Sequence, residues 1–294
     1  MQTAARISVT LFSDPGCPWA YSASPAHAVL RWRYGEQLDW RLVTIGLAED
    51  AARYVERGYT PTMSALGNMR YRRYGMPFAL EPRSRMAGTA RACRAIVATR
   101  LLDPAREQAV YRALQFGWFT TTLVLDEDHQ IATALERVAG LDVAAVVASI
   151  DDDRTLAAYE ADMREARTAA GSPTEFQGKA RQTDGPVRYS APSLVFESAA
   201  GTRLEAGGFQ PVEAYDVLIA NLDRMLERQE PPGEAIAALR RFPDGLVTQE
   251  VAAIMAPNNE SADRDAAERA LLELAGAGAV RRTQLGDDAI WQLA

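Results

Sequence analysis

A strand, a tight turn and a helix follow one another near the start of the chain, and this stretch constrains the fold more than any other. Residues 7–12, Ile-Ser-Val-Thr-Leu-Phe, predict a short strand, and residues 26–34, which are rich in Ala, Leu and Arg, predict a helix. The Asp14-Pro15-Gly16 sequence between them is typical of a sharp turn. Cys17 therefore lies at a strand-to-helix junction, with Pro18 in the first helical turn, where a missing N–H costs nothing.

The position of Cys17 predicts a reactive thiol. A sulfur at a helix start faces unpaired backbone amides and the positive end of the helix dipole, which favour thiolate over thiol. Asp14 opposes this effect, so we expect a moderately lowered pKa for Cys17, about 6–7.5. Free cysteines more often serve as small buried hydrophobic residues. A packing cysteine would not need a Pro-Gly turn and a flanking proline, and the sequence therefore favours the reactive interpretation.

The Cys17-Pro18-Trp19-Ala20 motif resembles the active site of the DsbA-like branch of thioredoxin-fold proteins, in which Cys-Pro-x-Cys opens the first helix. Ala20 occupies the place of the second, resolving cysteine. The only other cysteine, Cys93, lies among small residues in a predicted helix and is expected to be buried and inert. Two cysteines in 294 residues also exclude a disulfide scaffold.

The order of predicted elements strengthens this resemblance. Residues 38–45 alternate like a second strand, parallel to the first through a βαβ crossover. Strand signals return at 193–197 and 203–206 and are followed by a helix over 211–227. The intervening chain has only helical spacing, in segments 62–74, 84–102, 104–121, 128–139 and 143–168. This α/β order of βαβ, helical insertion and ββα resembles DsbA-like proteins, in which a helical domain interrupts a thioredoxin fold.

The resemblance also assigns a second site element. In thioredoxin-like folds a cis proline precedes the returning strand and faces the nucleophilic cysteine, and here that place is taken by Pro192. The residue before it, Ala191, would then offer backbone groups to an extended substrate. The resemblance thus implies a site with Cys17 as the catalytic residue and Pro18, Trp19, Ala191 and Pro192 as substrate-binding residues.

A second, smaller module is expected at the C-terminus. Residues 229–233, Gln-Glu-Pro-Pro-Gly, form a plausible linker, so we predict a thioredoxin-like domain over 1–230, with its insertion at about 48–185, and a module over 231–294. Three helices and a hairpin in this module resemble a winged helix. Ten acidic residues against six arginines from residue 233 onward exclude DNA binding, because phosphate contacts need the opposite charge. A protein-interaction or lid module is the remaining hypothesis.

Other candidate groups give weaker signals. His27 and His129 are far apart and have no cysteine partners, so they predict no metal site, and Lys179 is expected to be a surface residue, although it could reach the carboxylate of a thiol cofactor. The aromatic side chains of residues 113–119 have the spacing of core residues, with a substrate cleft as the alternative. A net charge of −7 argues against nucleic acid and anionic membranes as partners, no run approaches membrane-spanning length, and the cysteine usage favours a cytoplasmic protein.

These features predict a thiol-disulfide oxidoreductase with a monothiol mechanism. Without a second cysteine, Cys17 can attack a thiol-capped protein or a small disulfide, and a low-molecular-weight thiol such as mycothiol or glutathione must then release it; no tightly bound cofactor is expected. Two alternatives remain open. One is a thiol-cofactor-dependent isomerase or transferase, since 2-hydroxychromene-2-carboxylate isomerases and kappa-class glutathione transferases use the same fold with a serine at the site. The other is a redox-inactive binding protein, against which the retained Cys17 is evidence.

Overall fold

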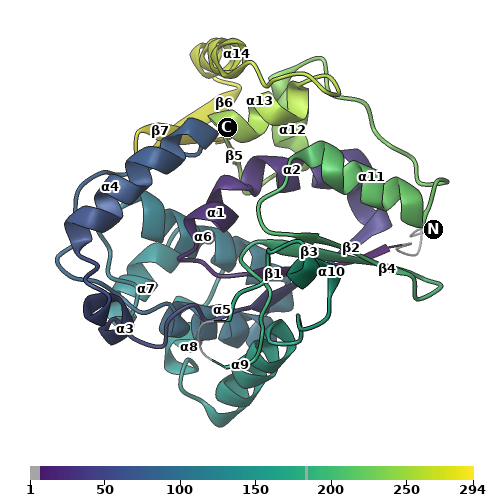
Figure 1. Ribbon diagram of the computed structural model, residues 1–294. Coiled ribbons are helices and arrows are strands. Elements are labelled where there is room, and N and C mark those ends of the chain that lie inside the picture. Colours follow the sequence, from purple (N-terminus) through teal and green to yellow (C-terminus); the bar gives the residue numbers. More distant parts are fainter. Residues whose placement is uncertain (1–6, 183–184) are drawn as a thin grey trace.

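The computed structural model describes residues 7–182 and 185–294, and its larger sheet forms around the first strand, β1 (Ile7–Ser13). The strand order is β2-β1-β3-β4, with β2 parallel to β1 and the two later strands antiparallel (Figure 1). This is the predicted thioredoxin-like arrangement. The other strands are β2 (Leu38–Thr44), β3 (Ser193–Ser198) and β4 (Arg203–Gly207).

Helices cover both faces of this sheet. The chain leaves β1 through α1 (Pro18–Ser22) and α2 (Ser24–Tyr34), and it returns after β4 through α11 (Val212–Leu222). Helices α2 and α11 lie on one side of the sheet and α9 lies on the other (Figure 1). Tyr215 and Ile219 of α11 are fully buried in the main core, so one face of this helix packs inward.

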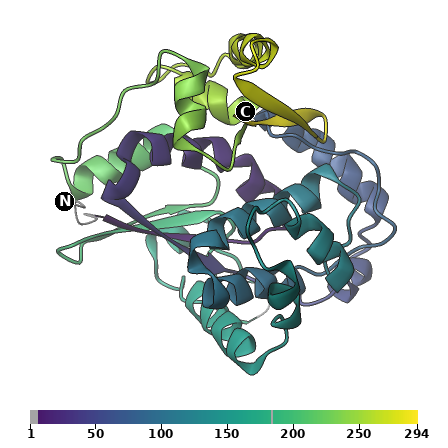
Figure 2. The ribbon, with the colours of Figure 1, turned by 180° about the vertical axis from the view of Figure 1, so that it is seen from behind.

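The predicted helical insertion lies between β2 and β3. Figure 2 shows these helices from behind, in blue to teal, beside the sheet. The apolar residues of α6 join the main core, which confirms that most of the aromatic side chains of residues 113–119 are core residues. The insertion comprises α3 (Ala52–Glu56), α4 (Pro61–Tyr71), α5 (Ala90–Leu102), α6 (Glu107–Thr120), α7 (Asp128–Leu135), α8 (Val143–Ala148), α9 (Asp153–Ala166) and α10 (Pro173–Phe176).

Four helix predictions were too long. The helix expected over 128–139 ends at Leu135. The helix expected over 84–102 begins at Ala90, because the N–H groups of Thr89 and Ala90 both donate to Ala48 O and hold the preceding segment against the loop after β2. The helix expected over 143–168 is divided into α8 and α9 by a turn that buries Ile150. The helix expected over 211–227 ends at Leu222. The short helices α3 and α10 were not predicted.

The C-terminal elements pack on α2 rather than standing apart. Ala28, Val29 and Trp32 of α2 share a buried cluster with residues of this region, and α13 packs directly along α2. Figure 1 shows these elements, in green to yellow, beyond α2 from the sheet. They comprise α12 (Ala235–Arg241), β5 (Leu246–Val247), α13 (Thr248–Met255), α14 (Arg264–Gly276), β6 (Val280–Leu285) and β7 (Asp288–Leu293), with a three-stranded sheet in the order β5-β7-β6. The predicted three helices and hairpin are present, whereas the winged-helix assignment and the domain boundaries stay predictions.

Candidate active site

Cys17 occupies the position that the sequence predicted. It is the N-terminal cap residue of α1, its N–H donates to Asp14 O at 3.1 Å, and Pro18 takes the first helical position. Gly16 makes this tight approach possible: a Cβ atom there would lie 2.6 Å from Thr89 Cγ2 and 3.0 Å from the Trp118 ring. The turn therefore carries the cysteine directly against the helical insertion.

The structure brings the Ala191–Pro192 loop to the same place. The Ala191–Pro192 peptide bond is cis, as predicted, and the Cys17 thiol donates a hydrogen bond to Ala191 O at 3.2 Å. Stacking of Tyr189 on Phe12, with ring centroids 4.2 Å apart, ties the loop to β1. Two elements that are 174 positions apart in the sequence thus form one site.

The predicted lowering of the Cys17 pKa is wrong. Cys17 is only 6% exposed, and burial raises the pKa of its thiol to about 12. The N–H groups of Ala20 and Trp19 at the start of α1 act in the predicted direction, but they do not offset the loss of water. The charge of Asp14 raises the pKa further, as expected. The thiol therefore rests protonated, as a hydrogen-bond donor.

Asp14 holds the turn in place through hydrogen bonds to its buried side chain. Its fully buried carboxylate accepts the N–H groups of Gly16 and Leu47, both at 2.8 Å, and the Thr89 hydroxyl at 2.8 Å. The Cys93 thiol lies 3.5 Å from Oδ2. Burial raises the pKa of Asp14 in spite of these donors. The sequence identified Asp14 only as a charge near Cys17, whereas the structure shows it joining the turn to the loop after β2 and to the start of α5.

An open cleft of about 770 Å³ begins at the turn. Gly16, Pro18 and Trp19 form one edge, and Trp19 is 38% exposed. The opposite wall comes from α3, α4 and the segment before α5, and from Trp118 and Phe119 at the end of α6, so part of the aromatic run 113–119 does face the cleft. The wall also carries four arginines, Arg70, Arg73, Arg83 and Arg85, which the sequence analysis did not identify.

Three of these arginines carry charge that no carboxylate of the described residues neutralises. Arg85 is paired with Asp126 and Glu127. Arg83 lies over the Trp118 ring and donates to Leu123 O, and burial lowers its pKa to about 10. Within residues 7–182 and 185–294, no ion pair is formed by Arg70, Arg73 or Arg83. The cleft beside Cys17 is therefore cationic.

The other candidate residues lie outside this site. His27 is buried between Trp40 and Tyr215, and burial lowers its pKa to about 3, so it is neutral. His129 is exposed near the start of α7, and Lys179 is a surface residue, as predicted. In the described part of the chain, no group of three His, Cys, Asp or Glu side chains is placed to hold a metal ion. Among the same residues, no helix has the length and hydrophobicity that a bilayer-spanning segment needs.

The comparisons with known proteins agree with the geometry. The sequence model of the DSBA-like thioredoxin domain matches residues 8–189, which is more than half of the chain. The chain belongs to this family. The match confirms the predicted DsbA-like fold and identifies the protein as a thiol-disulfide oxidoreductase by family. No curated protein sequence matches the chain.

Solved structures share the fold of this DsbA-like chain at low sequence identity. A probable DsbA oxidoreductase from Streptomyces coelicolor is 17% identical, covers 74% of this chain and 91% of its own, and superposes with a TM-score of 0.54. The cytosolic disulfide reductase DsbM from Pseudomonas aeruginosa is 18% identical, with coverages of 73% and 98% and a TM-score of 0.52. DsbM has also been solved with GSH, and that structure gives a TM-score of 0.51.

The two cysteines should differ in their reactivity and its pH dependence. Because the pKa of Cys17 is raised, its thiolate fraction is small at pH 7 and should increase about tenfold per pH unit. Iodoacetamide labelling of Cys17 should follow this increase from pH 7 to pH 9 without a plateau. Cys93 is 0% exposed, and burial raises its pKa as well, so it should react only after unfolding. Cys17→Ser and Cys93→Ser isolate each thiol, and a plateau of the Cys17 rate near pH 7 would contradict the raised pKa.

Proposed function

We propose that this DsbA-like protein exchanges disulfides by a monothiol mechanism through Cys17 and that a low-molecular-weight thiol releases it. The observation that carries the proposal is the contact of the Cys17 thiol with Ala191 O, next to cis Pro192. The residues that flank Cys17, Gly16 and Pro18, line the edge of an open cleft. Neither Ala20 nor the fully buried Cys93 supplies a second accessible thiol.

The hydrogen bond of the Cys17 thiol in the free protein is compatible with a mechanism in which substrate binding triggers the attack by the sulfur. An extended substrate that pairs with the Ala191 backbone competes for the carbonyl that now accepts the Cys17 thiol. The sulfur then attacks one sulfur of the substrate disulfide, forms a mixed disulfide and expels the other sulfur as a thiolate, which takes up the proton that Cys17 loses. The Ala20 and Trp19 N–H groups favour the negative charge on Cys17 during this step.

The second half of the cycle needs the external thiol. Its thiolate attacks the mixed disulfide, forms a new disulfide with the bound group and returns Cys17 to the thiol state, so that one disulfide is exchanged for another without net oxidation of the protein. The unpaired arginines of the cleft favour a thiol that carries carboxylates, because a guanidinium binds a carboxylate through two parallel hydrogen bonds. Of the two thiols considered, glutathione has this chemistry. Pro18, Trp19, Ala191 and Pro192 would contact the substrate.

Intact-mass spectrometry after incubation with glutathione disulfide or mycothiol disulfide tests this mechanism. The wild type should gain one thiol adduct on Cys17, and the matching reduced thiol should remove it. Cys93→Ser should behave as the wild type does, whereas Cys17→Ser should gain nothing. An adduct on Cys93, or the same adduct level in Cys17→Ser, would contradict the proposal. Noncovalent binding of the thiol without any adduct would instead support the isomerase or transferase hypothesis.

A further inference from the structure

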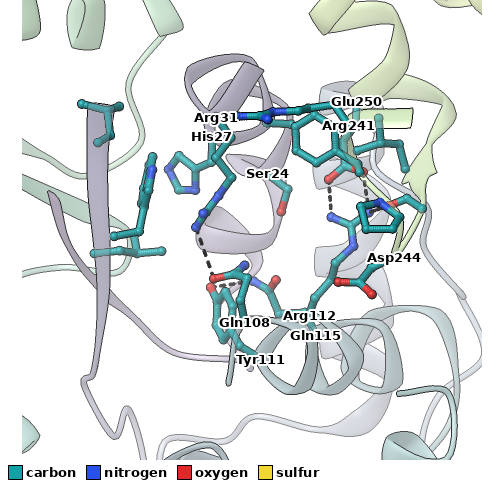
Figure 3. A pocket seen from close by; sticks show the side chains of 18 of the residues that line it. Ser24, His27, Arg31, Gln108, Tyr111, Arg112, Gln115, Arg241, Asp244 and Glu250 are labelled. Carbon is teal, nitrogen blue, oxygen red and sulfur yellow. Dashed lines mark hydrogen bonds and ion pairs between the residues drawn. The ribbon is translucent and has the colours of Figure 1, made fainter. Parts of the chain in front are cut away.

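A second cavity of about 540 Å³ lies on the other side of α1 from the Cys17 cleft. Among the described residues, none lines both spaces. Helix α2, the sheet and α6 form three of its walls, and the segment from Arg241 to Leu246 closes the fourth (Figure 3). The cavity is therefore created where the C-terminal elements meet the thioredoxin-like fold, and the proposed chemistry of Cys17 does not involve it.

The lining of this cavity combines apolar and polar side chains, as in sites for small organic molecules. Leu11, Leu38 and Leu246 form part of the apolar surface. Ser24 of α2 and Gln108, Tyr111 and Gln115 of α6 face one another across the space (Figure 3). The volume accommodates an aromatic ring with one or two substituents and exceeds what a single inorganic ion needs.

Arg31 is the distinctive residue of the cavity. Its guanidinium lies 4.2 Å from the centre of the Trp40 ring and reaches only Gln108 Oε1, at 3.3 Å, as a hydrogen-bond partner. It has no carboxylate partner in the described part of the chain. Burial and the neighbouring charge of Arg112 lower its pKa to about 10, so it still carries its charge at neutral pH. A partly buried cation without a counterion is suited to bind an anion.

The other charges around the cavity leave this preference in place. Arg112 is neutralised by Glu250. Arg241 lies at the rim, with its guanidinium against Gly35, and no ion pair to it occurs among residues 7–182 and 185–294. Glu36 and Asp244 also line the space, but both are exposed and neither lies within ion-pair distance of Arg31 or Arg241.

The walls also contain polar atoms that have no partner. His27 Nε2, Trp40 Nε1 and Arg112 Nε are buried without a hydrogen bond in the described structure. These three atoms are enclosed by the protein and not open to the cavity, so the groups that can hold a bound molecule are the accessible ones of the lining, Arg31 above all. His27 is neutral and adds no competing charge.

We propose that this cavity binds a small organic anion with an apolar body of aromatic size and one carboxylate or phosphate group. The anionic group is held by Arg31, with Arg241 adding positive charge at the rim, and the body lies against Leu11, Leu38 and Leu246. Because the Arg241–Leu246 segment forms one wall, the bound anion joins the C-terminal elements to α2 and α6.

Titration calorimetry of the full chain with four probes tests this proposal. Phenyl phosphate or benzoate should bind at one saturable site, inorganic phosphate should bind more weakly, and benzylamine, which carries the opposite charge, should not bind. The comparison of phenyl phosphate with benzoate distinguishes a phosphate from a carboxylate ligand. Arg31→Gln should weaken binding at least tenfold, which is the loss of about one charge-assisted hydrogen bond. Arg241→Gln should weaken it severalfold.

Matched variants separate this cavity from other cationic surfaces. Arg240→Gln removes a positive charge one residue before Arg241 but changes no residue of the cavity lining. Arg83→Gln removes a positive charge from the Cys17 cleft instead. Both variants should bind the aromatic anions like the wild type. Cys17→Ser should also bind normally. If Arg31→Gln does not fold, the affinities of Arg241→Gln and Arg240→Gln are compared instead, and only Arg241→Gln should bind more weakly than the wild type. The proposal is overturned if neither aromatic anion binds, if Arg240→Gln or Arg83→Gln weakens binding as much as Arg241→Gln does, or if benzylamine binds equally well.

Discussion

Ala20→Cys should form an intramolecular disulfide with Cys17. Positions 17 and 20 are the cap and the third residue of α1, so their side chains lie one turn apart at a helix start, within the distance that a disulfide spans without large backbone movement. Ala20 and Cys17 also belong to the same buried cluster, and the Ala20 N–H already points to the Cys17 sulfur. We expect nearly complete oxidation under mild oxidant, a gain of activity toward dithiol substrates and loss of stable mixed-thiol adducts.

Alkylation followed by intact-mass analysis measures this outcome. The oxidised variant should lose the mass of two hydrogens and resist alkylation at both positions until it is reduced. Ala23→Cys, just after the end of α1, is the control, because its side chain is not in the position of a resolving thiol. If Ala20→Cys stays reduced while Cys17 remains freely modifiable, the site is not a dithiol centre that has lost its second cysteine, and the isomerase or transferase hypothesis gains support.

The parts of the site that depend on local sequence could be predicted. The Asp14-Pro15-Gly16 turn, the helix start at Pro18 and the strand pairing each follow from residues that are close together in the chain, and the structure has them where expected. The cis bond before Pro192 was predicted from the family resemblance, since an isolated X–Pro sequence carries only a weak signal.

The environment of the thiol could not be predicted in this way. Its pKa depends on how much water reaches Cys17, and that is decided by distant segments: Ala191 covers the sulfur, and Thr89 and Trp118 press against the turn. The local helix-start effect had the right sign but was smaller than the effect of burial. The arginines of the cleft were missed for a similar reason, because Arg70 and Arg83 come to share a cleft with Pro18 and Trp19 only when the insertion folds over the turn.

The ion pair that joins α6 to the C-terminal elements was also not visible in the sequence, and it leads to a large expected effect on stability. Glu250 is 0% exposed. Its carboxylate accepts hydrogen bonds from both terminal nitrogens of Arg112, of which Nη1 lies at 2.6 Å. It also accepts one from the Val247 N–H at 2.9 Å. Removing one partner of a buried pair leaves an uncompensated charge. Glu250→Gln should therefore lower the free energy of unfolding by about 3–5 kcal/mol.

Urea unfolding of a double-mutant cycle measures this effect. Arg112→Met alone should be similarly destabilising, because it leaves the Glu250 charge buried. Arg112→Met combined with Glu250→Gln should cost much less than the sum of the single changes, because no lone buried charge remains. Glu160→Gln is the matched control: it breaks the exposed pair of Glu160 with Arg164, where both side chains are about 70% exposed, and should cost less than about 1 kcal/mol. If Glu250→Gln is no more destabilising than Glu160→Gln, the buried pair does not hold the C-terminal elements against α6, and their attachment depends on the apolar contacts with α2.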